Sequence, residues 1–97
     1  MSVSLSTHVL DVERGRPASG VRVELWQEEL VATAETDADG RIAELGGSEL
    51  HPGTYRLLFR PDSRFFKGVG IEVALEDGHY HVPLLVSSYS CTTYRGS

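Results

Sequence analysis

The chain has 97 residues, of which 40% are hydrophobic, and it carries a formal net charge of −5 at pH 7. This length fits one compact domain over residues 1–97, because so short a chain has no room for a second hydrophobic core. The acidic charge argues against nucleic acid as a partner, since nucleic-acid binding needs a clustered positive surface.

Neither a secretion signal nor a membrane span is evident in the sequence. The first residues, MSVSLSTHVLDV, are polar and alternating, and no stretch approaches the ~20 apolar residues that a membrane-spanning helix needs. The single cysteine, Cys91, cannot form an internal disulfide, so folding does not require an oxidising compartment. We therefore expect a cytoplasmic protein without a membrane partner.

Strands are predicted along most of the chain, because apolar and polar residues alternate with a period of two between frequent turn residues. The predicted strands cover residues 4–12, 21–27, 31–36, 54–60, 69–75, 79–86 and 89–95, with a possible short strand at 42–45. A sheet with one apolar face must bury that face against another layer. Seven or eight such strands therefore predict an all-β, two-sheet sandwich.

Turn residues separate these strands. The segment 15–20, which contains Pro17, closes the first connection, residues 37–40 form a tight turn, and residues 76–78 form a hairpin turn. The large residues expected in the core and at its edges are Trp26, Tyr55, Leu57, Phe59, Phe65, Phe66, Ile71, Val73 and Leu84.

Histidines provide the first candidate chemistry. In the first strand, alternation places Ser6 and His8 on one face and Thr7 and Val9 on the other. A single mid-strand histidine is more often structural or simply exposed, so His8 alone does not establish a site. His51 lies in a loop and receives no role.

His79 and His81 are two residues apart and so share one face of their strand. The pair could bind a common ligand or a metal. A zinc site normally uses about three or four protein ligands, however, and no Asp, Glu or Cys partner is evident nearby. The prediction is that no metal binds.

Arg41 and the C-terminal residues are ambiguous from local sequence alone. Arg41 leaves the tight turn at residues 37–40, where the ordinary interpretation is a solvated surface charge. The tail Tyr94-Arg95-Gly96-Ser97, taken as a bare tetrapeptide, is expected to fray.

Four segments, in order, nevertheless resemble the transthyretin-related 5-hydroxyisourate hydrolase family. They are LSTHVLDVERGRPASGVRVELW, TDADGRI, HYHVPLL and SSYSCTTYRGS. The resemblance implies a transthyretin-like sandwich, a homotetramer, and hydrolysis of 5-hydroxyisourate to 2-oxo-4-hydroxy-4-carboxy-5-ureidoimidazoline in urate degradation, without a cofactor. It places the active site on His8, Arg41, His81 and the tail Tyr94-Arg95-Gly96-Ser97.

The roles that follow from this resemblance are those of a water-activating hydrolase. His8 and His81 would activate water and transfer protons, because the imidazole pKa lies near neutrality. Arg41 would bind substrate oxygens through its permanently charged donors. Ser97 would orient a histidine or the substrate, and the tail from Tyr94 to Ser97, with Arg95 and Gly96, would contribute to substrate binding.

Two other functions remain open at this point, a transthyretin-type carrier of small ligands and a structural β-sandwich module. Neither explains the terminal YRGS. The sequence also departs from the family in residues 61–67, which are too few for the family's short helix, and in Ser88, Ser90 and Cys91, where the family more often has Pro, Gly and Tyr. We therefore expect a sandwich that lacks this helix.

Overall fold

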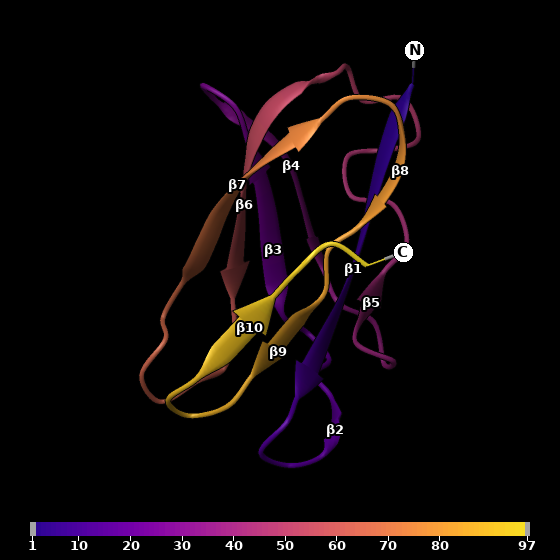
Figure 1. Ribbon diagram of the computed structural model, residues 1–97. Coiled ribbons are helices and arrows are strands. Elements are labelled where there is room, and N and C mark those ends of the chain that lie inside the picture. The colour runs from indigo at the N-terminus through magenta and orange to yellow at the C-terminus, as the bar shows by residue number, and fades with distance from the viewer. Residues whose placement is uncertain (1, 97) are drawn as a thin grey trace.

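The computed structural model describes residues 2–96, which form two β-sheets packed against each other (Figure 1). This architecture confirms the predicted all-β sandwich. The strands in the described residues are β1 (Val3–Asp11), β2 (Arg16–Pro17), β3 (Arg22–Trp26), β4 (Leu30–Glu35), β5 (Arg41–Ile42), β6 (Gly53–Arg60), β7 (Val69–Leu75), β8 (Gly78–His81), β9 (Leu84–Val86) and β10 (Cys91–Thr93). Among residues 2–96 there is no helix, and hence none that could cross a membrane.

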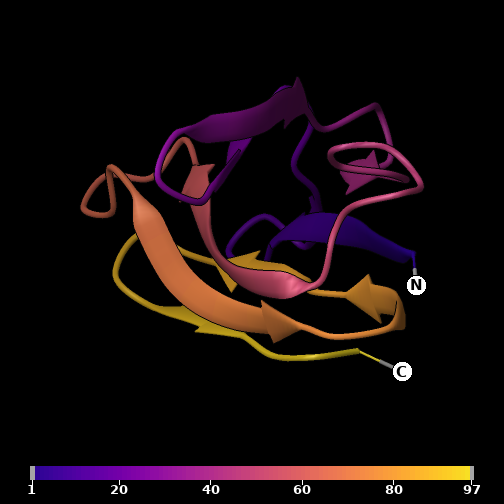
Figure 2. The same ribbon diagram turned by 90° about the horizontal axis from the view of Figure 1, so that it is seen from above.

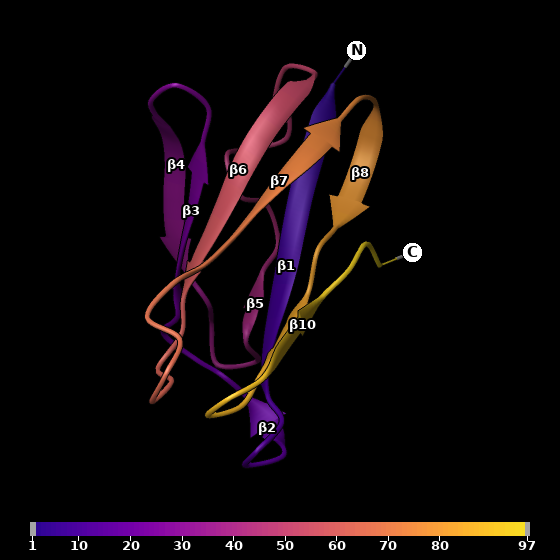
Figure 3. The same ribbon diagram turned by 60° about the vertical axis from the view of Figure 1, so that its left-hand side comes forward.

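The two sheets differ in how their strands are connected. One is a four-stranded antiparallel sheet in the order β4-β3-β6-β7. The other is six-stranded and is organised around β1, which pairs in parallel with β8 and β9 and antiparallel with β2 and β5, while β10 pairs with β9. Figure 2 views the two layers from above, and Figure 3 shows the four-stranded layer on one side and β1, β8 and β10 on the other.

The alternation predicted for β1 is confirmed. Val3, Leu5, Thr7 and Val9 are at most 1% exposed and face the core. The residues between them are half-buried and face outward, and they are Ser4, Ser6, His8 and Leu10. Sheet geometry thus gives one strand a largely polar outward face and a largely apolar inward face.

Some strand boundaries differ from the predicted ones. The segment predicted as one strand at 79–86 is split into β8 and β9 at Val82 and Pro83, because proline has no backbone N–H to continue a ladder. The last strand is shorter than 89–95, and β5 covers only Arg41–Ile42 rather than 42–45. Together with the two-residue β2, this split accounts for ten strands in the described residues where seven or eight were expected.

The hairpin predicted at residues 76–78 is wrong. The turn forms, with Gly78 at φ 85°, and the Tyr80 hydroxyl accepts the Glu76 N–H at 3.0 Å. However, β7 belongs to the four-stranded sheet and β8 pairs with β1 in the other. The turn therefore carries the chain from one layer to the other.

Most of the predicted core residues are confirmed. Tyr55, Leu57, Phe59 and Leu84 are buried, and the partly buried Ile71 and Val73 pack against them. Trp26 is half-buried at the edge of the core, and Phe66 is half-buried in the connection between β6 and β7. Phe65 is the error: it is 65% exposed, and its ring lies against those of Phe66 and Tyr89.

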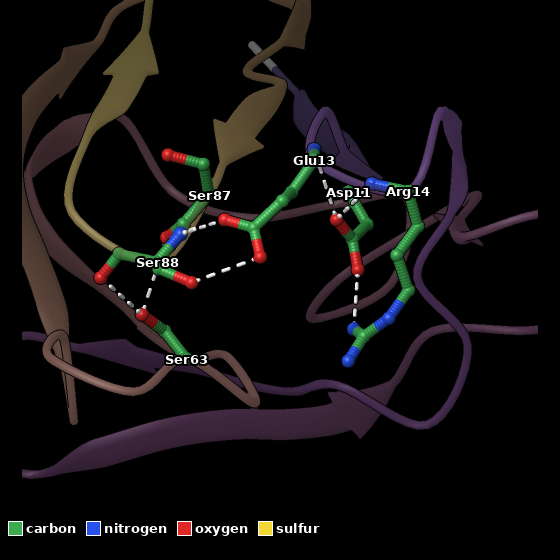
Figure 4. A network of polar contacts seen from close by, with 6 residues as sticks. All are labelled: Asp11, Glu13, Arg14, Ser63, Ser87 and Ser88. Atoms are coloured by element: carbon green, nitrogen blue, oxygen red, sulfur yellow. Dashed lines mark hydrogen bonds and ion pairs between the residues drawn. The ribbon is translucent and has the colours of Figure 1, made fainter.

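The connection between β6 and β7 is organised by a serine instead of a helix (Figure 4). The Ser63 hydroxyl is nearly buried, accepts the backbone N–H groups of Phe65 and Phe66, and lies 3.2 and 3.3 Å from the carbonyl oxygens of Ser87 and Ser88. A hydroxyl has a single proton, so it donates to one of these carbonyls at a time. Ser63 thereby ties this connection to the loop between β9 and β10.

Ser63→Ala should lower the free energy of unfolding by about 1–3 kcal/mol, because it leaves partly buried backbone groups without their partner. Ser90→Ala is the matched control, since Ser90 is exposed in the neighbouring loop, and it should leave stability nearly unchanged. Chemical denaturation of the three proteins measures the difference. Equal stability of Ser63→Ala and Ser90→Ala would contradict this role.

Candidate active site

The outward face of the six-stranded sheet gathers the predicted site residues. β1 lies between β5 and β8, and its register pairs His8 with Arg41 and Ser6 with His81. Residues directly opposite in a sheet project their side chains to the same face. Arg41, His8, Ser6 and His81 therefore stand close together on the outward face, although Arg41 and His81 are 40 residues apart in sequence.

The turn before β5 fixes the position of Arg41. The Asp37 carboxylate accepts the backbone N–H groups of Asp39 and Arg41, each at 2.9 Å, and these bonds hold its pKa below the usual range. Gly40 adopts φ 76° and lies so close to β1 that a Cβ there would be 2.5 Å from the Val9 carbonyl oxygen. The tight turn predicted at 37–40 thus presses against β1 and places Arg41 beside His8.

The same turn fixes which ring nitrogen carries the proton when His8 is neutral. Its Nε2 lies 2.9 Å from the Asp39 carbonyl oxygen. A carbonyl oxygen only accepts hydrogen bonds, so Nε2 carries the proton and donates. Nδ1 is then the ring nitrogen of His8 that can accept a proton.

His81 is held from two sides. Its Nδ1 lies 2.7 Å from the Ser6 hydroxyl, and its carbonyl oxygen accepts the Gly96 N–H at 2.6 Å. Partial burial is the largest cause lowering the pKa of His81, and charge repulsion from Arg41, and from His8 and His79 when they are protonated, lowers it further. His81 is therefore neutral at pH 7 and able to accept a proton.

The C-terminal segment reaches this site at Gly96. A Cβ on Gly96 would lie 2.8 Å from Cδ2 of the His81 ring, so only glycine allows the segment to approach so closely. Figure 3 shows the last described residues after β10 beside the end of β8, the strand whose last residue is His81. Ser97, predicted to act at this site, lies outside the described residues.

The two residues before Gly96 are placed differently. The Arg95 guanidinium lies 4.3 Å from the centre of the Tyr80 ring, and Tyr80 pairs with the buried Leu5, so it projects away from His79 and His81. Arg95 thus anchors the tail on the opposite face from the histidines. The Tyr94 side chain is 54% exposed. Of the described tail residues, Gly96 is the one brought against His81.

Three further residues of this face, His79, Ser4 and Ser6, received no role from the sequence patterns. The His79 ring lies between two serines of β1, with Nδ1 2.6 Å from the Ser4 hydroxyl and Nε2 2.8 Å from the Ser6 hydroxyl. The signal was present, because Ser4 and Ser6 share a face with His8, but the parallel pairing of β1 with β8 was not predicted.

The remaining candidates lie elsewhere. His51 is exposed in a loop, where its carbonyl oxygen accepts the Tyr55 hydroxyl at 2.6 Å. Cys91 is half-buried and packs against the core. Within residues 2–96 no group of three or more His, Cys, Asp or Glu side chains is arranged to hold a metal ion.

Comparison with known proteins assigns the chain to a family. The model of the family described as HIUase/Transthyretin matches residues 5–96. The chain belongs to this family. The resemblance recognised in the four sequence segments is thereby confirmed.

Relatives within the HIUase/transthyretin family match over nearly the full length. A 5-hydroxyisourate hydrolase from Pseudomonas aeruginosa is 41% identical, over 96% of this chain and 90% of that protein. A protein named 5-hydroxyisourate hydrolase 2, from Rhizobium meliloti, is 40% identical over 96% of this chain and 95% of its own length.

Solved structures of this family give the same fold. The 5-hydroxyisourate hydrolase of Klebsiella pneumoniae superposes with a TM-score of 0.90 at 37% identity, covering both chains completely. Sea bream transthyretin in complex with thyroxine superposes with a TM-score of 0.86 at 28% identity, covering 95% of this chain and 93% of that one. The transthyretin-like fold is therefore confirmed, and the activity must be decided by the residues on the outward face.

Proposed function

We propose that the protein hydrolyses 5-hydroxyisourate to 2-oxo-4-hydroxy-4-carboxy-5-ureidoimidazoline, as a step of urate degradation. One observation carries this proposal: the register of β1 with β5 and β8 gathers Arg41, His8 and His81 on one face, with Gly96 closing against His81. A guanidinium beside two histidines supplies both an anion-binding group and proton acceptors. The full-length relatives named as 5-hydroxyisourate hydrolases support the same activity.

The reaction follows from these groups. A neutral histidine, His8 through Nδ1 or His81 through Nε2, removes a proton from water as the water oxygen attacks the ring carbonyl carbon. The Arg41 guanidinium donates hydrogen bonds to the carbonyl oxygen as it becomes negatively charged. The protonated histidine then gives its proton to the departing ring nitrogen, the C–N bond breaks, and the ring opens.

Activity should depend on pH through His81. Its lowered pKa keeps it neutral, so activity should be retained as pH falls to the ordinary histidine value of about 6.5 and be lost only below it, as His81 becomes protonated. The acidic side of a kcat/KM profile measures this loss. An acidic limb at or above the ordinary histidine value would argue that His81 is not the base.

The decisive experiment follows the absorbance of freshly generated 5-hydroxyisourate with and without the protein. We expect the protein to accelerate its decay well beyond the spontaneous rate, and the His8→Ala/His81→Ala double variant to restore that rate. Decay unchanged by the protein would overturn the proposed activity. Thyroxine binding measured in parallel tests the carrier alternative, for which the structural likeness to sea bream transthyretin is the supporting observation.

We also propose that the protein is a homotetramer in which the outward faces of the six-stranded sheets meet over the site and leave His79, which lies beside the start of β1, open to water. The site residues lie on an open sheet face, where His8 and His81 are half-buried and Arg41 is exposed, so a facing subunit would enclose the substrate. Light scattering should give a mass of about four times 10.6 kDa, with the closed symmetry usual for such assemblies. A stable and fully active monomer would contradict this arrangement.

A further inference from the structure

His79 has no part in the reaction described above, yet it is joined to His81 through one hydroxyl group. The Ser6 Oγ lies 2.7 Å from Nδ1 of His81 and 2.8 Å from Nε2 of His79. At its other end, Nδ1 of His79 lies 2.6 Å from the Ser4 Oγ. These contacts form a continuous chain from His81 through Ser6 and His79 to Ser4, along paired positions of β1 and β8.

We propose that Ser6 and His79 form a proton relay, in which a proton accepted by His81 at the site is passed through the Ser6 hydroxyl to His79 at the surface. This inference rests on the proposed hydrolase activity, and it gives Ser6 and His79 positioning roles that act through His81.

The single proton of the Ser6 hydroxyl constrains both rings. When Ser6 donates to one ring nitrogen, the other ring nitrogen must donate to Ser6 if all the contacts are satisfied. If His81 carries its proton on Nδ1, then His79 carries its own on Nδ1. If His81 carries it on Nε2, so does His79. The two neutral rings therefore hold the same tautomer, and His81 can act as a base at Nε2 only in the first of these states.

Every proton in the relay is accounted for. Nε2 of His81 takes a proton from the attacking water, and the proton on its Nδ1 passes to the Ser6 oxygen. The original Ser6 proton passes to Nε2 of His79, which becomes an imidazolium whose Nδ1–H donates to Ser4. The reverse sequence returns the proton to Nδ1 of His81 as Nε2 protonates the departing nitrogen.

Burial and charge favour this direction of transfer. His81 is half-buried and His79 is exposed, so water stabilises a positive charge better on His79 than on His81. Arg41 of β5 and His8 of β1 also face His81 and oppose its protonation, which keeps its pKa low. A positive charge passed from His81 to His79 would no longer directly face Arg41 and His8.

Kinetics of four variants test the relay. Ser6→Ala and His79→Ala should each lower kcat by about tenfold or more with little change in KM, the scale known for hydrogen-bond partners that orient metal-bound histidines in the same way. Ser6→Thr keeps the hydroxyl and should restore kcat. The control His51→Ala removes an exposed loop histidine and should retain full activity.

Two readouts separate a relay from a purely structural role. Raising the imidazole concentration should restore kcat to His79→Ala, because a soluble base can replace an exposed proton acceptor, but it should not rescue Ser6→Ala. Nitrogen NMR of the ring atoms should show one shared tautomer for His79 and His81 in the native protein and loss of this correlation in Ser6→Ala.

The NMR measurement needs no substrate, so it distinguishes failure of the relay from failure of the proposed activity. Correlated tautomers in a protein that does not hydrolyse 5-hydroxyisourate would leave the coupling intact and overturn only the activity. Independent tautomers, or Ser6→Ala and His79→Ala with kcat within about twofold of the native value, would overturn the relay.

Discussion

Replacement of His8 or His81 by alanine should reduce the turnover of 5-hydroxyisourate by about 10²–10⁴-fold, the usual contribution of positioned acid–base groups, and Arg41→Ala should reduce it by about 10²–10³-fold, the usual cost of losing a donor to the developing oxyanion. The fold should persist, because all three side chains lie on the outward face and none belongs to the buried core. Steady-state kinetics together with melting temperatures measure the two effects separately.

His51→Ala is the control for this series. His51 is exposed in a loop and contributes its backbone carbonyl to Tyr55, a contact that alanine retains. Its turnover should match that of the native protein. If His51 proved essential while His8 or His81 proved dispensable, the assignment of roles to the outward face of β1 would be wrong.

Deletion of residues 94–97 should reduce turnover by about 10²-fold or more, because it removes the segment that holds His81, and small displacements of a reacting group carry costs of that size. Stability should fall by only about 1–3 kcal/mol, since the described part of this segment is held by the Gly96 backbone hydrogen bond and by Arg95 stacking on Tyr80. Kinetics and thermal unfolding of the intact and truncated proteins test this separation.

A point substitution sharpens the same test. Gly96→Ala would place a methyl group 2.8 Å from Cδ2 of His81, so the ring or the tail must shift. Gly47→Ala would be a poor control, because Gly47 has φ 87°, a conformation that alanine adopts only with strain. Thr92→Ala is the better control, because it alters an exposed residue of β10 and should leave turnover unchanged. Turnover of the truncated protein within about twofold of the native value would show that the tail is not part of the active site.

Local patterns in the sequence predicted the features that depend on neighbouring residues. Alternation in β1 placed Ser6 and His8 opposite Thr7 and Val9 because side chains in a strand alternate with a period of two. The turn at residues 37–40 was predicted because Asp and Gly at these positions favour such a turn, and the structure uses the Asp37 carboxylate and the φ of Gly40 for this purpose.

Features that depend on distant pairing were not predictable from these patterns. The glycine turn at 76–78 indicates a reversal of the chain but does not specify which sheet the next strand joins, so the predicted hairpin became a crossing between layers. Because strand partners were unknown, His79 was also left without a role, since its contacts with Ser4 and Ser6 arise from the parallel pairing of β8 with β1. Phe65 was predicted in the core or at its edge because apolar character does not reveal that its short connection lies at the surface.

Because β1 is the central strand of its sheet, the alignment that the core requires is also the alignment that the catalytic groups require. A one-residue slip of β1 would turn Ser4, Ser6 and His8 into the core and expose Leu5, Thr7 and Val9 to water. Burial of unpaired polar groups makes a chain with this slip unstable. A folded molecule in which β1 is misaligned with β5 and β8 should therefore not accumulate. Each folded molecule should therefore carry its acid–base groups in register, and preparations should differ in the fraction folded rather than in the activity of the folded fraction.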